Sequence, residues 1–201
     1  MEKIDIIAKK GWVFMYKLCK TEQSAKRQRE LEQGLLSAMA THQYEEISVS
    51  DLCDHMNIPR KSFYRYFSSK DGALHALIDH TLLDYESFSN GQQMHQSEME
   101  RFFRFWRLQT PLLDALARSN LSSLLVTRTI DHTLSDVSIL PRYLRHEQRQ
   151  FREQATVFAV SGLMMLILNW HNSGYALSVN QMADIGMQLL TKPLFSVPDL
   201  Y

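Results

Sequence analysis

Apolar residues recur along this chain at intervals of three and four, the spacing that places them on one face of a helix. Residues 25–41, with His42 directly after them, carry one such stripe, made of Leu31, Leu35, Ala38, Met39 and His42. Residues 70–86 carry another, made of Leu74, Leu77, Ile78, Leu82 and Tyr85. We expect each segment to be a helix whose striped face lies against a core.

Helix-start and turn signals lie close together between these two stripes. Ser48-x-x-Asp51 has the form of a capping box and predicts a helix. The residues that this helix should bury are Val49, Leu52, Cys53 and Met56. Asn57 tolerates a left-handed backbone and predicts a tight turn after it. Pro59 suits the first turn of a third helix, which should be about two turns long.

The segments on either side of this region are also expected to be helical. Ser68-x-x-Asp71 predicts a second capping box at the start of the long helix over 70–86. Residues 3–20 can form a cationic amphipathic helix, although Gly11 weakens it. That helix could pack on the body, form a partly ordered tail, or act as an arm that contacts DNA or another protein.

Beyond residue 86 the pattern predicts helices at about 95–109, from Pro111 onward, within 119–135, at 142–171 and at 178–190. They are separated by Asn90-Gly91, residues 138–141 and residues 172–175. The pattern therefore predicts an all-α protein with about ten helices, which form a small three-helix head and a larger helical body.

Composition agrees with a folded helical protein. Of 201 residues only 7 are Gly and 5 Pro, which favours helices over strands. The formal net charge of zero excludes a bulk polycation that packs DNA, but it allows a local basic face. Cys19 and Cys53 form no C-x-x-C pair, so a disulfide framework is not expected. We see no export signal and expect no membrane span, and therefore predict a cytoplasmic protein.

The two helices on either side of Asn57 form a candidate helix-turn-helix unit, in which the second helix enters the major groove of DNA. Its exposed start carries Arg60, Lys61 and Ser62, whose side chains can address base edges. Suitable phosphate contacts, which fix the register on the duplex, are Ser48, Tyr64, Tyr66 and Lys70. Spacing alone leaves an ordinary helical corner open as the alternative.

The segment 47–71 closely resembles the DNA-binding head of TetR-family regulators. Its most specific part is Phe63-Tyr64-Arg65-Tyr66-Phe67-x-x-Lys70, and the resemblance covers about residues 24–75. It implies a three-helix head, a linking fourth helix and a regulatory body that homodimerises. By position, Tyr64 and Lys70 match the family's phosphate-contacting residues, and Tyr66 stands where an aromatic residue or His is usual. The variable recognition positions fall on Arg60, Lys61 and Ser62.

This sequence departs from the family pattern at three points. Asn57 stands where Gly is usual, Pro59 replaces the usual small polar cap, and the N-terminal extension is longer than in most members. The expected division is an N-terminal extension over 1–23, a DNA-binding domain over 24–70, an effector-binding and dimerisation domain over 71–191, and a tail over 192–201.

The body contains a segment, 158–170, that is apolar on nearly every side, so it is either central in the core or shared with a second subunit. With 178–190 it resembles the last two helices of many TetR members, which form a four-helix bundle between subunits. The expected dimer contacts are Leu163, Leu166, Ile167, Trp170, Ile185 and Leu189. Side chains that could line an effector pocket, or simply form core, are Phe102, Phe103, Trp106 and Trp170.

No catalytic motif, P-loop or dinucleotide fingerprint is present, so we expect no enzyme, no cofactor and no metal site. The sequence therefore predicts a homodimeric regulator, a repressor by the family's commoner mode, that binds a palindromic double-stranded operator under the control of a small molecule. The competing hypothesis is a helical interaction or ligand-binding protein that keeps this fold without binding DNA.

Overall fold

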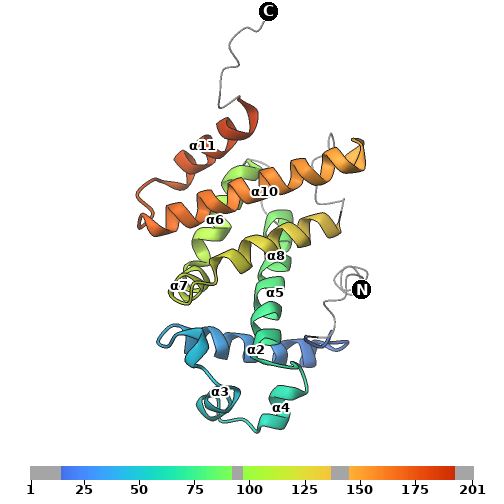
Figure 1. The fold of residues 1–201 in the computed structure, drawn as a ribbon, viewed down its shortest axis with the longest axis vertical. Coiled ribbons are helices and arrows are strands. Elements are labelled where there is room, and N and C mark those ends of the chain that lie inside the picture. The colour runs from blue at the N-terminus through green and yellow to red at the C-terminus, as the bar shows by residue number, and fades with distance from the viewer. Residues whose placement is uncertain (1–14, 92–96, 137–144, 193–201) are drawn as a thin grey trace, which may run out of the picture.

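A computed structural model describes residues 15–91, 97–136 and 145–192 of the chain. Within these ranges there are nine α-helices, one short 3-10 helix and no strands. Figure 1 shows a small group of helices at one end and a larger group at the other, with helix α5 (Lys70–Gly91) running between them. The all-α class and the division into a small head and a larger body are confirmed.

The head consists of α2 (Glu22–Met39), the 3-10 turn η2 (Tyr44–Glu46), α3 (Val49–His55) and α4 (Arg60–Tyr64). On α2 the apolar stripe is buried, with Leu31, Leu35 and Met39 fully enclosed. The prediction for His42 is wrong. The helix ends at Met39, so His42 lies in the following turn and is exposed.

The start of α5 differs from the predicted capping box. The hydroxyl of Ser69, not Ser68, accepts a hydrogen bond from the amide of Gly72 at 3.1 Å. Ser68 instead donates its hydroxyl to the carbonyl of Met15 at 2.9 Å, and Asp71 accepts from the hydroxyl of Tyr44. The backbone of Met15 comes so close that a Cβ on Gly72 would lie 2.0 Å from the Met15 oxygen, so this position requires glycine.

That close approach also explains why the described end of the predicted N-terminal helix, residues 15–20, is not helical. Lys17 donates its amide to the carbonyl of Tyr66 at 2.7 Å, and Ser68 donates its amide to Met15 at 3.0 Å. These bonds hold the segment as an extended strand-like contact against the end of the head, with a single bridge between Tyr16 and Phe67. The rest of the predicted helix, residues 3–14, lies outside the described residues.

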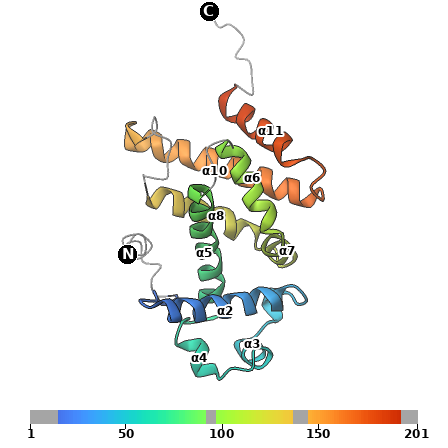
Figure 2. The ribbon, with the colours of Figure 1, turned by 180° about the vertical axis from the view of Figure 1, so that it is seen from behind.

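The body contains α6 (Glu98–Leu108), α7 (Thr110–Arg118), α8 (Ser122–Ser135), α10 (Arg149–Asn172) and α11 (Val179–Thr191). Helix α10 packs along α8, and α11 packs on α6 (Figure 2). The expected break at 172–175 is confirmed, with positive φ at Gly174 and Tyr175. Helix α10 begins later than predicted because the backbone at Gln148 is non-helical, with ψ 140°. The predicted loop at 138–141 lies outside the described residues.

Helix α10 is the part of the body that bears on the expectation of no membrane span. Among the described residues it is the one helix whose length and composition would allow it to cross a membrane. Only 22% of the residues in its most apolar window are buried within this chain. One side of this helix is covered by its packing on α8, whereas much of its apolar surface faces outward.

Buried charges connect the head, α5 and the body. The carboxylate of Asp79 on α5 accepts from Arg128 Nε of α8 at 2.9 Å and from a second guanidinium nitrogen of the same residue. It also accepts from the hydroxyl of Tyr16 at 2.6 Å, and burial beside this carboxylate raises the pKa of Tyr16. Nearer the head, His80 Nδ1 lies 2.8 Å from the carboxylate of Glu32 on α2. Glu32 is fully buried.

Removing one partner of the Asp79–Arg128 pair should destabilise the protein strongly. The Arg128→Met change leaves a buried carboxylate without its cation, a loss of about 3–5 kcal/mol in systems of this kind. The double change Asp79→Leu with Arg128→Met should recover most of that loss. Urea unfolding followed by circular dichroism measures both. A loss below about 1 kcal/mol for Arg128→Met would contradict this assignment.

Candidate nucleic-acid interface

Helix α3 begins at the predicted capping box. The Ser48 hydroxyl accepts from the amide of Asp51 at 3.1 Å, and the Asp51 carboxylate accepts from the amide of Ser48 at 3.2 Å. The hydroxyl of Ser48 also donates to this carboxylate, and that bond is the main reason that the pKa of Asp51 is lowered. The two residues thereby satisfy amides that have no partner in the first turn of a helix.

The turn between α3 and α4 is the one that Asn57 predicts. Asn57 has φ 51°, in the left-handed region, and the amide of Ile58 closes the turn on the carbonyl of Cys53 at 2.9 Å. Pro59 precedes the helix as its N-cap, with ψ 140°, so it stands one position earlier than predicted. Proline has a fixed φ and no amide donor, and both properties suit the N-cap as well as the first turn of a helix.

Helix α4 is short, and one side chain fixes how it is rotated. Phe63 is fully buried and packs on Phe67, with 5.2 Å between the ring centroids. With Phe63 inward, Arg60, Lys61 and Tyr64 lie on the exposed side, and 54% of Tyr64 is accessible. The regular helix ends at Tyr64, so it is shorter than the two turns predicted.

The structure separates the predicted DNA-contacting residues into three groups. The first group is exposed at the end of the molecule that α3 and α4 form (Figure 1) and consists of Ser48, Arg60, Lys61 and Tyr64. Ser62 and Lys70 are half-buried. Tyr66 does not fit the prediction of a phosphate contact, because the chain turns inward after α4 and leaves only 7% of its side chain accessible.

Arg65 is a candidate that the sequence interpretation did not select. It is exposed at the C-cap of α4, four residues after Lys61. A spacing of four places two residues on the same helix face, and this spacing was the signal that could have identified it.

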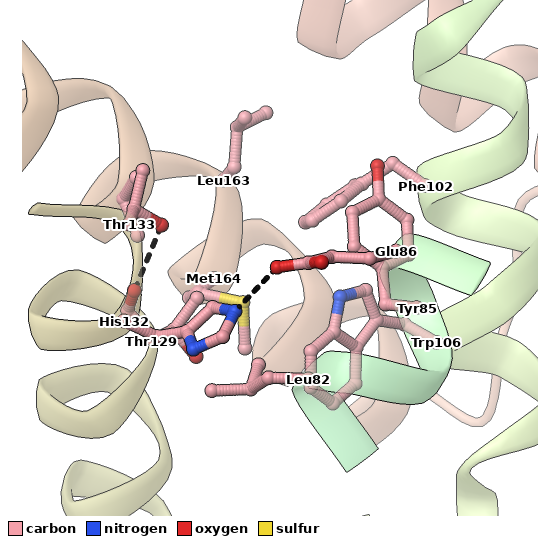
Figure 3. Close-up of a pocket in the computed structure, with 11 residues that line it drawn as sticks. Leu82, Tyr85, Glu86, Phe102, Trp106, Thr129, His132, Thr133, Leu163 and Met164 are labelled. Carbon is pink, nitrogen blue, oxygen red and sulfur yellow. Dashed lines mark hydrogen bonds and ion pairs between the residues drawn. The ribbon is translucent and has the colours of Figure 1, made fainter. Parts of the chain in front are cut away.

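A cavity of about 190 Å³ lies within the body, between α5, α6, α8 and α10. Figure 3 shows its lining, in which aromatic side chains face the polar side chains of α8. The lining residues are Leu82, Tyr85, Glu86, Phe102, Trp106, Thr129, His132, Thr133, Val160, Leu163 and Met164. Glu86 and His132 pair with each other in this lining, with 2.9 Å between Oε1 and Nε2.

Two of the four predicted pocket residues, Phe102 and Trp106, line this cavity. Phe103 and Trp170 do not. They pack on each other with 5.7 Å between ring centroids and are buried in the core. Phe103 follows Phe102 on the helix, so its side chain turns about 100° away, toward α11, where it closely approaches Gly186. The indole of Trp170 donates to the carbonyl of Leu177 at 2.8 Å.

The lining residues from α5 and α8 were not predicted. Tyr85 belonged to the predicted core stripe, but no sequence signal indicated that α8 would place His132 opposite Glu86. Among the described residues, no group of His, Cys, Asp and Glu could hold a metal ion.

The family model of bacterial regulatory proteins of the tetR family matches residues 36–77, which extend from the end of α2 through α3 and α4 into α5. The match covers the helix-turn-helix and the first part of the linking helix. The chain is a TetR-family protein. Its head is a DNA-binding domain, and the chain is a transcription regulator by family, as the resemblance implies.

Solved structures of two regulators share the fold of this TetR-family chain. One, titled "Dihydroxyacetone kinase operon activator DhaS", has a TM-score of 0.52 and 17% identity, covering 82% of this chain and 93% of its own. The other is the fatty acid degradation regulator FadR from Bacillus halodurans, with a TM-score of 0.56 and 14% identity, covering 88% and 98%. At these identities the likeness concerns the fold. No curated protein matches the sequence significantly.

Lys70, which the TetR-family resemblance matches to a phosphate-contacting lysine, has a structural partner in this chain. Its ammonium donates to the carbonyl of Ile47 at 2.7 Å and to that of Tyr44, and it lies 4.1 Å from the centre of the Tyr44 ring. These contacts connect the start of α5 to the turn that precedes α3. Burial raises the pKa of Tyr44, whose hydroxyl donates to Asp71, and so keeps that hydroxyl protonated.

Substitution of Lys70 should therefore lower stability as well as any DNA affinity. Lys70→Met leaves two carbonyls without their donor and should cost about 1–3 kcal/mol of unfolding free energy. Lys61→Ala removes an exposed side chain and should change it by less than about 0.5 kcal/mol. Thermal and urea unfolding of the two variants measure the difference, and equal stabilities would show that the Lys70 contacts contribute nothing.

Proposed function

We propose that this TetR-family protein is a sequence-specific, homodimeric repressor whose affinity for its operator changes when a small molecule binds in the body. The main support for DNA binding is the way Phe63 anchors α4 in the core. With Phe63 buried, Arg60 and Lys61 are exposed at the first turn of this helix. Such a helix can present cationic donors to base edges in the major groove.

Each residue of this surface has a proposed role. Arg60, Lys61 and Ser62 read base edges, whereas Tyr64, Ser48 and Arg65 contact phosphates that set the register of the head on the duplex. Asp51 and Asp54 are exposed on α3, and the charge of Arg60 contributes to the lowered pKa of Asp51. These acidic residues restrict the cationic surface to the exposed side of α4. Affinity for nonspecific DNA should therefore be modest and strongly salt-dependent.

Dimerisation is proposed through the outward faces of α10 and α11. On α10, exposed positions recur every three or four residues and include Phe158 and Met165, which are 70% and 56% accessible. Gly162 lies between them with nothing near its Cβ position, so a second helix could approach closely there. On α11, Met187 and Leu190 are also exposed. Exposed apolar residues that gather on one face are typical of an interface.

This proposal keeps some of the predicted dimer contacts and drops others. Leu163, Leu166, Ile185 and Leu189 are half-buried, so they can border the interface. The prediction that Ile167 and Trp170 contact a second subunit is wrong. Both lie on the opposite side of α10 and are buried within the chain, at 0% and 2% exposure.

Control by a small molecule is proposed because α5 belongs to both parts of the molecule. Its first turn is bonded to the head through Lys70 and Asp71, and Leu82, Tyr85 and Glu86 near its other end line the cavity. A ligand that fits only one position of α5 would shift the population of head positions, and would thereby change operator affinity.

The DNA-binding proposal is tested by selecting bound fragments from genomic DNA, followed by mobility-shift titrations at several salt concentrations. Arg60→Ala and Lys61→Ala should each weaken specific binding by about tenfold or more, because each good base contact contributes about 1–3 kcal/mol. The matched control is Arg118→Ala, which removes an exposed cation from the end of α7.

That control should bind almost as the wild type does. If no fragment is selected, or if Arg118→Ala weakens binding as much as Arg60→Ala, DNA recognition through α4 is contradicted. A stoichiometric protein partner found instead would favour the interaction-protein hypothesis. A reporter placed behind the selected fragment, assayed with and without the protein, distinguishes repression from activation.

The dimer proposal is tested by light scattering after size-exclusion chromatography. The wild type should have twice the mass of one chain, and Phe158→Asp should shift it to a single chain, because a charge would be buried without a partner in the interface. Leu108→Asp changes a similarly exposed apolar residue outside α10 and α11, and should stay dimeric. A monomeric wild type, or a dimeric Phe158→Asp, would contradict the proposed face.

A further inference from the structure

The size of the body cavity limits what it can hold. An engineered apolar cavity of about 150 Å³ binds benzene, and this cavity is about 190 Å³. It therefore has room for one six-membered ring with a short substituent. Three aromatic residues, Tyr85, Phe102 and Trp106, form one side of it, and Leu82, Leu163 and Met164 supply aliphatic surface. Planar apolar groups suit such a lining.

One polar atom in this lining lacks a partner within the described part of the chain. Trp106 is 1% exposed, and its indole nitrogen is buried without a hydrogen bond. In Figure 3 the nitrogen-bearing edge of the Trp106 ring is turned toward the middle of the lining residues. A buried donor without an acceptor is unfavourable, and native proteins rarely keep one without a reason.

The polar groups on the opposite side already have partners. The hydroxyls of Thr129 and Thr133 donate to carbonyls of their own helix, those of Leu125 and Thr129, each at 2.8 Å. Glu86 and His132 are paired with each other at 2.9 Å, and both are 14% exposed. Trp106 therefore supplies a buried donor that a ligand in the cavity can satisfy.

We propose that the cavity binds a neutral molecule with a single ring and an oxygen acceptor, such as an aromatic ketone or alcohol, and that the acceptor bonds to the indole N–H of Trp106. An anion would be placed beside the carboxylate of Glu86. A cation would meet the positive end of the indole N–H, and it would have to compete with His132 for Glu86. This inference rests on the proposed effector site and names the ligand class for it.

The test uses the full-length chain without DNA and a set of probes with closely similar skeletons. Acetophenone carries the oxygen acceptor, ethylbenzene has the same carbon skeleton without it, and 1-phenylethylammonium replaces the oxygen with a cation. Calorimetry should give acetophenone an affinity about tenfold or more above both others, because a site that offers a buried donor discriminates against a ligand lacking the acceptor.

Indole signals in a proton–nitrogen NMR spectrum provide an independent readout, since the chain has three Trp residues. Acetophenone should move the Trp106 indole proton downfield, and ethylbenzene should not. Trp106→Phe should remove the preference for acetophenone over ethylbenzene. Trp170→Phe is the matched control, because the indole of Trp170 already donates to Leu177, and this variant should keep the preference.

Equal affinity for acetophenone and ethylbenzene would overturn the proposal, because the cavity would then be merely apolar. Tightest binding of the ammonium probe, or the absence of binding by all three at millimolar concentration, would overturn it as well. If Trp106→Phe fails to fold, the wild-type NMR shift alone decides. Because no DNA is present, failure here leaves the DNA-binding proposal intact, and failure to select an operator leaves the ligand class testable.

Discussion

Helix α5 has to pack against the head and the body at once, and the rest of the structure depends on this constraint. Its first turn can pack beside the N-terminal segment only because Gly72 leaves room for the backbone of Met15. In its middle, Glu32 of the head faces His80, and Arg128 of the body pairs with Asp79. Its later turns line the body cavity. A displacement of α5 must therefore change contacts in both parts of the molecule.

The buried cluster around Asp79 joins three separate segments of the chain. Tyr16 comes from the N-terminal segment, Asp79 from α5 and Arg128 from α8, next to Thr129 in the cavity wall. Buried pairs of this kind add little net stability compared with an apolar core, but breaking one is costly. Their geometric requirement makes the cluster suited to holding α5 in one position relative to α8.

Much of the head could be predicted from local signals. Ser48 with Asp51 marks a helix start, Asn57 marks a turn, and the apolar stripe of α2 marks a buried face. These signals act over a few residues, so the sequence contains them in full. Predictions failed where a partner distant in sequence decides the outcome. Ser68 bonds to Met15 instead of capping α5, and residues 15–20 are extended because they pair with the end of the head.

The functional surfaces were predicted only in part, for the same reason. Arg60, Lys61 and Tyr64 are exposed because Phe63 is buried, which follows from helical spacing. Tyr66 turns inward after the helix ends, and Lys70 finds carbonyls of the preceding turn, neither of which spacing reveals. In the body, the apolar pattern of α10 indicated a shared or central helix, but only its packing on α8 shows which face remains exposed.

The central claim is that DNA is read by the exposed edge of α4 in a head whose position α5 sets. Amide hydrogen exchange of the full chain, alone and bound to its selected DNA fragment, tests it most directly. DNA should slow exchange at residues 47–67 and in the first turns of α5, while α7 is unchanged. Slowed exchange confined to the body, with residues 47–67 unaffected, would contradict it.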